Sequence, residues 1–338
     1  MRVTVNDIAK AAKVSQTTVS RVLNNHPYIK ESTRKKVLQA IEELNFSPDS
    51  VARSMITGKT KTLGLIVGDI SNPYFAESAK IIIGQAKTLG YDVIISNTDH
   101  DDGSFEDAVR SLMAKRVDGL LISSVYKSSE TIQRLYDSGF PVVLFINRPA
   151  EDPCNYVVLD NEKGIRLAVE HLVQLGHRKI AFVSGPFKYS AIHQRYLGFE
   201  AALRHHGLEV RSDFVYSETF DYDRVYHFVD KLLSMKDAPT AFMSASDQIA
   251  LVVMDAAANK KLSIPGDVSV VGFDNMRIAS NQYIGLTTVS QQKEKMAFFA
   301  LEHLVQLIEK GDTVSLPVRV VIEPELIVRK TTGPVKPS

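Results

Sequence analysis

The stretch VTVNDIAKAAKVSQTTVSRVLN, residues 3–24, predicts two short helices joined by a tight turn. Thr4 and Asp7 lie three residues apart, the spacing of a helix-capping hydroxyl and its reciprocal carboxylate. A break at Lys13 and Val14 follows, and Ser15 is a second capping hydroxyl. Apolar residues at helical spacing form two inward stripes, Val5, Ile8, Ala9 and Ala12 in the first helix and Val19, Val22 and Leu23 in the second. Two helices this close together are typical of a helix-turn-helix.

A third helix completes the small amino-terminal core. A loop over residues 24–28 contains Pro27, and helical periodicity then runs from Ser32 to Asn45. Its expected inward residues are Val37, Leu38, Ile41 and Leu44. The three apolar stripes together are long enough to close a small all-α core.

Charge is unevenly distributed along the chain. The 338 residues include 40 Lys and Arg and 39 Asp and Glu, so the formal net charge is +1. Residues 1–62 alone hold eleven basic and five acidic side chains, a net of +6, which leaves −5 for the remainder. A basic head on an acidic body favours a polyanionic partner for the head, and a solvated basic helix face is the alternative.

The outward face of the second helix carries side chains that suit a DNA major groove. Gln16 can pair with adenine, Thr17 can meet a thymine methyl group and Arg21 can fork onto guanine. Hydroxyl and amide groups suited to phosphate contacts surround them, namely Thr4, Ser15, Ser20, Asn24 and Tyr28. For Gln16 and Thr17 the alternative is ordinary solvent-facing polarity.

Residues 3–24 strongly resemble the DNA-binding head of the LacI/GalR family of bacterial transcription regulators. The likeness continues through STRKKV at 32–37, IEELNFSP at 41–48, VARSM at 51–55 and TKTLGLIV at 60–67, and covers essentially the whole chain. The resemblance implies that Gln16 and Thr17 occupy positions that vary with the operator, and that Arg21 reads a base edge. Lys13 and Lys30 depart from the family pattern, which has Gly and a hydroxyl helix cap at these places.

Residues 49–56 are too short to form a stable isolated helix and lie between Pro48 and Gly58. The resemblance implies that this segment becomes a hinge helix on operator DNA, where two copies enter the minor groove. Met55 would then be the apolar wedge that bends the DNA, with Ala52 as a further contact. The alternative is that Met55 packs against the same residue of a second copy.

From residue 62 onward, short apolar runs alternate with helical stretches, which predicts parallel sheets in α/β layers. The expected strands fall into two series, 63–69, 91–97, 119–124 and 142–147, then 156–159, 179–184, 215–219, 241–245 and 268–273. Helices are expected between them, for example at 76–89, 161–175 and 248–260. Two series predict two lobes, and the resemblance implies two Rossmann-like lobes of periplasmic-binding-protein type, joined by three crossing strands.

The expected domain organisation combines these features. Residues 1–47 form the head and 48–61 the hinge and linker. The amino-terminal lobe combines 62–160 with 292–320, and the carboxyl-terminal lobe combines 161–291 with 321–330. Residues 331–338 are a polar tail without leucine heptads, which favours a dimer over a coiled-coil tetramer.

Several polar and aromatic residues follow the carboxyl ends of expected strands, where ligands bind in such sheets. The resemblance implies an effector site made of Tyr74, Phe75, Asn147, Asp160, Arg195, Phe220, Ser246 and Asp274. Arg195 and Asp274 are its central pair. Competing roles remain open, since Asp69, Asp160 and Asp247 can cap helices and Tyr74 and Phe75 can pack between lobes. Asn147 and Ser246 replace the Asp and Asn usual in the family and leave the ligand's identity open.

Other classes of function find little support. Cys154 is the single cysteine, which excludes a disulfide within the chain and a cysteine-based zinc site. No Gly-rich dinucleotide motif, phosphate-binding loop Lys, nucleophile elbow or metal-spaced histidine set occurs, so we expect no enzyme, no cofactor and no metal. The nine histidines are interpreted as surface or core residues. No apolar run is long enough for a membrane helix and no signal peptide is evident, which favours the cytoplasm.

We therefore expect a dimeric, ligand-responsive transcription regulator that binds double-stranded operator DNA at a pseudopalindrome. We expect that a small sugar-type effector releases the regulator from its operator. A corepressor or a phosphoprotein partner remains an alternative. A second hypothesis is a cytoplasmic sugar-binding protein whose head serves only for oligomerisation.

Overall fold

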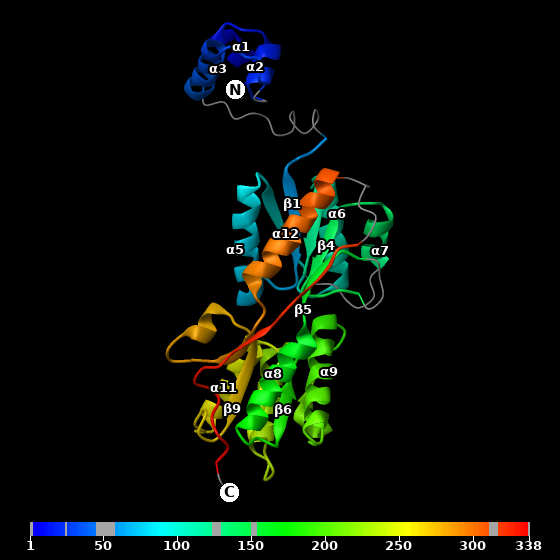
Figure 1. Ribbon diagram of the computed structural model, residues 1–338, viewed down its shortest axis with the longest axis vertical. Coiled ribbons are helices and arrows are strands. Elements are labelled where there is room, and N and C mark those ends of the chain that lie inside the picture. The colour runs from blue at the N-terminus through cyan, green and yellow to red at the C-terminus, as the bar shows by residue number, and fades with distance from the viewer. Residues whose placement is uncertain are drawn as a thin grey trace. The chain divides into compact units, whose positions relative to one another are not determined.

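The computed structural model describes residues 3–23, 26–44, 58–123, 130–149, 154–310 and 317–336 (Figure 1). The chain divides into two compact units, residues 1–61 and 62–338. Asn24 and the expected hinge residues Ala52 and Met55 lie outside the described residues. In the described part of the chain, no helix is both long enough and apolar enough to cross a membrane.

The first unit is a bundle of three helices, α1 (Val5–Ala12), α2 (Gln16–Leu23) and α3 (Glu31–Glu43). Its buried side chains are Ile8, Ala9, Ala12, Val19, Val22, Val37 and Ala40. The predicted inward stripe of α3 was partly wrong, because Leu38 is 51% exposed and Leu44 is 36% exposed. Val37 and Ala40, about one helical turn apart, face the core, and Leu38 is turned away from that face by about 100° from Val37.

The helix ends of this unit follow the sequence signals closely. Thr4 and Asp7 form the reciprocal capping box, with the Thr4 backbone N–H donating to Asp7 Oδ2 at 2.9 Å. Ser15 Oγ accepts from the Thr18 backbone N–H at 3.1 Å and so caps α2. Lys13 ends α1 at φ 54°, in the left-handed region that glycine adopts more easily. Lys30 precedes α3 without a side-chain cap.

The amino-terminal lobe of the second unit is built on a six-stranded parallel sheet in the order β11-β5-β4-β3-β1-β2. Its strands are β1 (Thr62–Val67), β2 (Asp92–Asn97), β3 (Gly119–Ile122), β4 (Val142–Phe145), β5 (Tyr156–Leu159) and β11 (Arg319–Ile322). Its helices are α5 (Pro73–Thr88), α6 (Asp102–Ala114), α7 (Glu130–Asp137) and α12 (Lys293–Lys310). Helix α5 begins three residues before the expected position because Asn72 Oδ1 accepts from the Tyr74 N–H and caps it.

The carboxyl-terminal lobe has a second six-stranded sheet in the order β12-β10-β9-β8-β6-β7, parallel except for the β10–β12 pair. Its strands are β6 (Ile180–Val183), β7 (Val215–Tyr216), β8 (Ala241–Ser244), β9 (Ser269–Asp274), β10 (Thr287–Ser290) and β12 (Glu325–Ile327). The helices are α8 (Asn161–Gln174), α9 (Ser190–His205), α10 (Tyr222–Leu233) and α11 (Asp247–Asn259), with short 3-10 turns η1 (Ser212–Phe214) and η2 (Arg277–Ser280).

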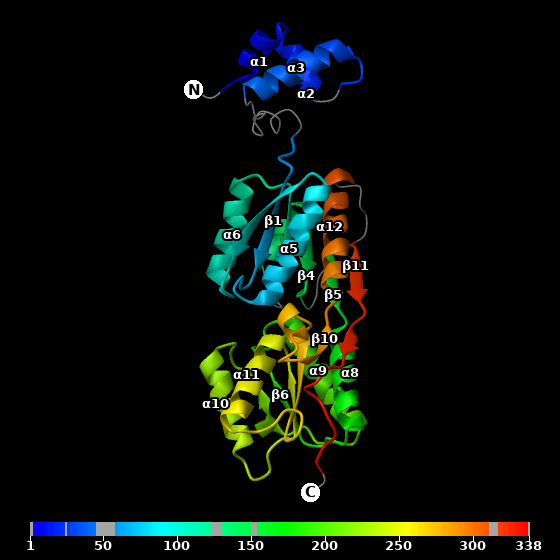
Figure 2. The same cartoon turned by 90° about the vertical axis from the view of Figure 1, so that its left-hand side faces the viewer.

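The chain crosses between the two lobes three times, after β5, after β10 and after β11, as Figure 2 shows on one side of the unit. Because β11 extends to Ile322 within the first sheet, the third crossing lies two residues beyond the expected boundary at 320. The three crossings bring the carboxyl ends of the strands of both sheets to one interlobe cleft.

Candidate functional site

The exposed face of α2 carries the residues predicted to read DNA bases. Gln16, Thr17 and Arg21 are exposed, Ser20 is half-buried, and Val19 and Val22 on the opposite face are buried in the core. The polar stripe is thereby held on a rigid helix by the apolar one.

The residues predicted to meet phosphates divide into two kinds. Thr4 and Ser15 already serve as caps, because the Thr4 hydroxyl donates to Asp7 at 2.7 Å and Ser15 accepts from Thr18. They mark the amino-terminal ends of α1 and α2, where backbone N–H groups favour anions. Tyr28 is 89% exposed in the loop before α3.

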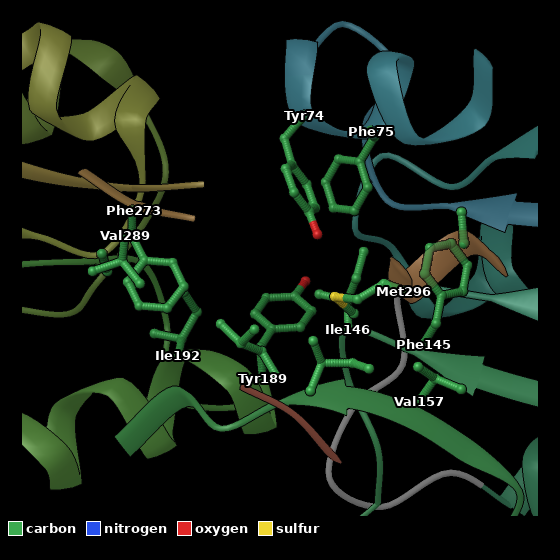
Figure 3. Close-up of a cluster of buried hydrophobic side chains, with 14 of the residues drawn as sticks. Tyr74, Phe75, Phe145, Ile146, Val157, Tyr189, Ile192, Phe273, Val289 and Met296 are labelled. Carbon is green, nitrogen blue, oxygen red and sulfur yellow. The ribbon is translucent and has the colours of Figure 1, made fainter. Parts of the chain in front are cut away.

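A cavity of about 160 Å³ lies in the cleft between the two lobes. Seven of the eight predicted effector-site residues line it, namely Tyr74, Phe75, Asn147, Arg195, Phe220, Ser246 and Asp274. Figure 3 shows Tyr74 and Phe75 approaching this region from α5, and Tyr189 and Ile192 approaching it from the other lobe. The predicted residue outside the lining is Asp160, which instead caps α8 by accepting from the Lys163 N–H at 2.9 Å.

Arg195 lines the cavity, and two of its guanidinium nitrogens are hydrogen-bonded within the protein. Its Nε donates to Asn161 Oδ1 at 2.9 Å, and its Nη1 donates to the Ala245 carbonyl at 2.6 Å. The guanidinium carbon lies 3.7 Å from the centre of the Phe273 ring, a stacked cation–π contact. These contacts fix one orientation of the guanidinium at the cavity floor.

Asp274 is the last residue of β9 and connects the two lobes through a chain of side chains. Gln291 Nε2 donates to Asp274 Oδ1 at 2.5 Å, and the Tyr74 hydroxyl donates to Gln291 Oε1 at 3.0 Å. Burial raises the pKa of the Asp274 carboxyl above its usual value, while the nearby Arg195 guanidinium lowers it. The cavity therefore contains a carboxyl group that can accept or donate a hydrogen bond.

Helix α11 begins differently from the expectation that Asp247 caps it. Ser246 is the cap, since its Oγ accepts from the Ile249 N–H at 3.1 Å. Asp247 is buried, accepts from the Met276 N–H at 2.7 Å and bonds the Thr288 hydroxyl. Asp247 thus ties β10 and the segment after β9 to α11, and it does not line the cavity.

Asp69 stands at the cavity but caps no helix. Its Oδ1 accepts from the backbone N–H and the hydroxyl of Ser71, at 2.8 and 2.6 Å. The cap of the following helix is Asn72, so the competing role considered for Asp69 was wrong.

His100 is a lining residue that the sequence analysis missed. Its ring centroid lies 6.1 Å from that of Phe75, 5.3 Å from Tyr189 and 5.5 Å from Phe220. It therefore touches rings from both lobes. Burial lowers the pKa of His100, which favours the neutral imidazole. The available signal was its position just after β2, since ligand sites gather at the carboxyl ends of strands.

The described residues contain no group of three or more His, Cys, Asp or Glu side chains arranged to hold a metal ion. Cys154 is buried. Further polar and aromatic residues of the cavity lining are Asn72, Tyr189, Tyr222, Gln248 and Gln291. The cavity is thus suited to binding an organic ligand by a buried ion pair, amide groups and aromatic faces.

Comparison with known families and proteins gives consistent matches along the chain. The model described as bacterial regulatory proteins of the lacI family matches residues 4–49, and the model for periplasmic binding proteins and the sugar-binding domain of the LacI family matches residues 60–324. The catabolite control protein A of Priestia megaterium is 36% identical over 325 residues, covering 95% of this chain and 98% of that protein. The repressor PurR of Mannheimia succiniciproducens is 35% identical over 330 residues, covering 97% and 98%.

Solved structures of transcription regulators are also similar to this chain. The lac repressor dimer bound to operator and the anti-inducer ONPF has a TM-score of 0.87 at 29% identity, covering 98% of this chain and all of that chain. The complex of the regulator CelR with cellobiose has a TM-score of 0.73 at 29% identity, with the same coverage.

Proposed function

Because the chain belongs to the LacI family of bacterial regulatory proteins, and is a DNA-binding transcription regulator rather than an enzyme, we propose that it is a dimeric repressor released from its operator by a small sugar-type effector. The observation that carries the effector proposal is the buried Arg195–Asp274 pair, which lies in a cavity flanked by aromatic rings. As a regulator of bacterial operators, it would act in the cytoplasm.

For DNA, the proposal assigns base contacts to Gln16, Thr17 and Arg21. Phosphate contacts fall to Thr4, Ser15, Ser20, Asn24 and Tyr28. The exposure of the α2 face and the solved lac repressor dimer on operator support this assignment. Two heads related by a two-fold axis would read two half-sites, so the operator would be a pseudopalindrome. Ala52 and Met55 would act in the minor groove.

For the effector, the volume and chemistry of the cavity favour one small ring. A cavity of about 150 Å³ accepts a benzene-sized molecule, and this one is about 160 Å³. The Asp274 carboxyl and the Arg195 guanidinium suit adjacent hydroxyl groups, which need both acceptors and donors. Tyr74, Phe75 and Phe220 offer ring faces for the apolar side of a sugar. CelR, whose structure matches 98% of this chain, has been solved with cellobiose.

A planar nucleobase is the second candidate, and one observation favours it. Rings line much of the cavity: Tyr74, Phe75, His100, Tyr189, Phe220 and Tyr222. A flat heterocycle can stack between such rings while the Arg195–Asp274 pair reads its edge.

The proposed mechanism is linkage between the cleft and the head. An effector that binds one lobe arrangement more tightly than the other shifts the population towards it, and a coupling of about 1–3 kcal/mol is typical. The ordering of residues 48–61 would be the element that transmits this shift to the operator-bound head.

Two measurements test the proposal on the full-length protein. A thermal-shift screen against monosaccharides and nucleobases should raise the melting temperature for the true class, because a ligand that binds only the native state stabilises it. The gain should vanish in Asp274→Ala and Arg195→Ala, and binding retained in both would place the site elsewhere.

Binding to DNA from upstream of the gene should weaken steeply with salt. Negligible binding at both low and high salt would favour a head that serves only for oligomerisation.

A further inference from the structure

Helix α9 begins without a capping hydrogen bond from the side chain at its own cap position. Tyr189 occupies the cap position with an extended backbone, and its side chain makes no capping hydrogen bond. The backbone N–H groups in the first turn of a helix have no partner within the helix. The first turn of α9 is also close to the proposed effector site, because Arg195 lies on the same helix one turn after Ala191.

The missing cap comes from the other lobe. Asn147, which follows β4, reaches across the cleft, and its Oδ1 accepts from the Ala191 N–H at 3.2 Å. Next to this bond, the Arg148 N–H donates to Ser190 Oγ at 3.0 Å. Asn147 is 6% exposed, so the contact is shielded from water. These two bonds join the end of β4 in one lobe to the start of α9 in the other.

The backbone before Asn147 adopts an unusual conformation that directs this side chain. Ile146 has φ 74°, and the Asn147 N–H donates to the Phe145 carbonyl at 2.9 Å, which closes a three-residue γ-turn. A positive φ is unfavourable for a β-branched residue, and such turns are rare and strained. Strained backbone of this kind persists where neighbouring contacts hold it in place.

The amide of Asn147 uses both of its functional atoms in protein contacts. Its Nδ2 donates to the Ser123 carbonyl at 3.0 Å, within its own lobe, while Oδ1 serves α9. A side-chain amide supplies a donor and an acceptor together, whereas a carboxylate supplies acceptors alone. Both polar atoms of the Asn147 amide are therefore hydrogen-bonded to other residues, although Asn147 lines the cavity.

We propose that Asn147 is a latch between the lobes, which caps α9 from the opposite lobe and thereby positions Arg195 when the cleft is closed. Opening of the cleft removes the cap from the Ala191 N–H. Closure restores it and aligns the helix that carries the effector-binding guanidinium. The latch follows from interlobe geometry alone and holds for either class of effector.

Hydrogen exchange of the full-length protein, followed by mass spectrometry with fragment resolution at residues 190–194, tests the latch. In Asn147→Ala the Ala191 amide should exchange about fivefold faster, the change expected for loss of a helix cap. Asn147→Asp loses the bond to the Ser123 carbonyl, as the Ala and Leu variants do, but it keeps an acceptor and adds a negative charge at a helix amino terminus, so it should retain most of the protection of Ala191. Asn147→Leu, which has similar size and no acceptor, should lose it.

Asp221→Ala is the matched control, because Asp221 caps α10 within one lobe by accepting from the Arg224 N–H at 2.9 Å. This variant should speed exchange at the start of α10 and leave Ala191 unchanged. Unchanged Ala191 exchange in Asn147→Ala would overturn the latch, as would equal loss in the Asp and Leu variants. A parallel rise at α10 in Asn147→Ala would show a general loss of stability and would also contradict it.

Discussion

Nη1 of Arg195 lies 3.9 Å from Oδ1 of Asp274, and the two side chains are only 4% and 5% exposed. An ion pair so well buried is held by further hydrogen bonds on both sides, from Arg195 to Asn161 and Ala245 and from Gln291 to Asp274. A charge removed from water at this depth is costly when its partner is lost. The pair therefore sets the stability of the cleft as well as its chemistry.

Arg195→Leu should destabilise the protein by about 3–5 kcal/mol, because it removes the nearest cation from the buried Asp274 carboxyl and leaves Asn161 Oδ1 and the Ala245 carbonyl without their donors. Asp274→Asn should cost less, about 1–3 kcal/mol, since the amide can still accept from Gln291 and the Arg195 guanidinium keeps two other acceptors. Urea unfolding followed by circular dichroism measures both changes.

The double variant Arg195→Leu/Asp274→Leu provides the check on this interpretation. The comparison also needs the single variant Asp274→Leu. If the two charges interact, the double variant should lose less free energy of unfolding than Arg195→Leu and Asp274→Leu lose together. Additive losses within about 0.5 kcal/mol would mean that the pair does not interact, and would contradict the energetic role given to it.

The fold could be predicted well from the sequence because its signals are local and repeated. Capping at Thr4 and Ser15, and the alternation of apolar runs with helices, depend on neighbours within a few residues. The error at Leu38 arose because a stripe of apolar residues was wider than the face that the small core covers. Tertiary packing decides which of two adjacent apolar residues is buried.

The site was less predictable because it depends on contacts between distant segments. Asp160 and Asp274 both lie at the carboxyl ends of strands, yet one caps a helix and the other lines the cavity. The local sequence offered Asp160 both roles, because a helix was expected from residue 161, but it did not decide between them. His100 was missed for the same reason, because its neighbours Tyr189 and Phe220 belong to the other lobe.

His100→Phe should reduce the loss of stability of the protein in mild acid. Burial lowers the pKa of the native His100, so the unfolded chain, with an ordinary value near about 6.5, takes up a proton first. Stability is then fully present above about pH 6.5 and falls as the pH decreases below it. The facing charged groups are Asp69 and Asp99, which favour protonation, and Lys188, which opposes it.

The wild-type protein should lose more stability than His100→Phe between pH 7.5 and pH 5.5, and above pH 7.5 the stability of both proteins should depend on pH in the same way. Contributions from His171, His177 and His303, whose pKa values burial also lowers, are common to both proteins and cancel. Identical pH profiles for the two proteins would show that His100 is not buried neutral in the cleft.

Lys13→Gly should stabilise the head by about 0.5–1 kcal/mol. Lys13 has φ 54° at the end of α1, a conformation that costs an L-residue about 1–2 kcal/mol and glycine almost nothing, although glycine adds entropy to the unfolded chain. Calorimetry of the full-length protein measures the head transition. Lys13→Ala removes the same charge and retains the strain, so a gain equal to that of glycine would attribute the effect to charge instead.

Arg21→Ala should weaken operator binding by about 1–3 kcal/mol and relax the preference at one base pair in each half-site, because the role proposed for this exposed arginine on α2 is to read a base edge. Tyr28→Phe removes one neutral donor from an 89% exposed side chain, and should weaken all duplexes alike by a smaller amount. Fluorescence anisotropy measures both variants against the duplex that the wild-type protein selects from a random pool and against its single-base-pair changes. Uniform weakening by Arg21→Ala across these duplexes would assign Arg21 to the phosphates, since a phosphate contact carries no information about the base.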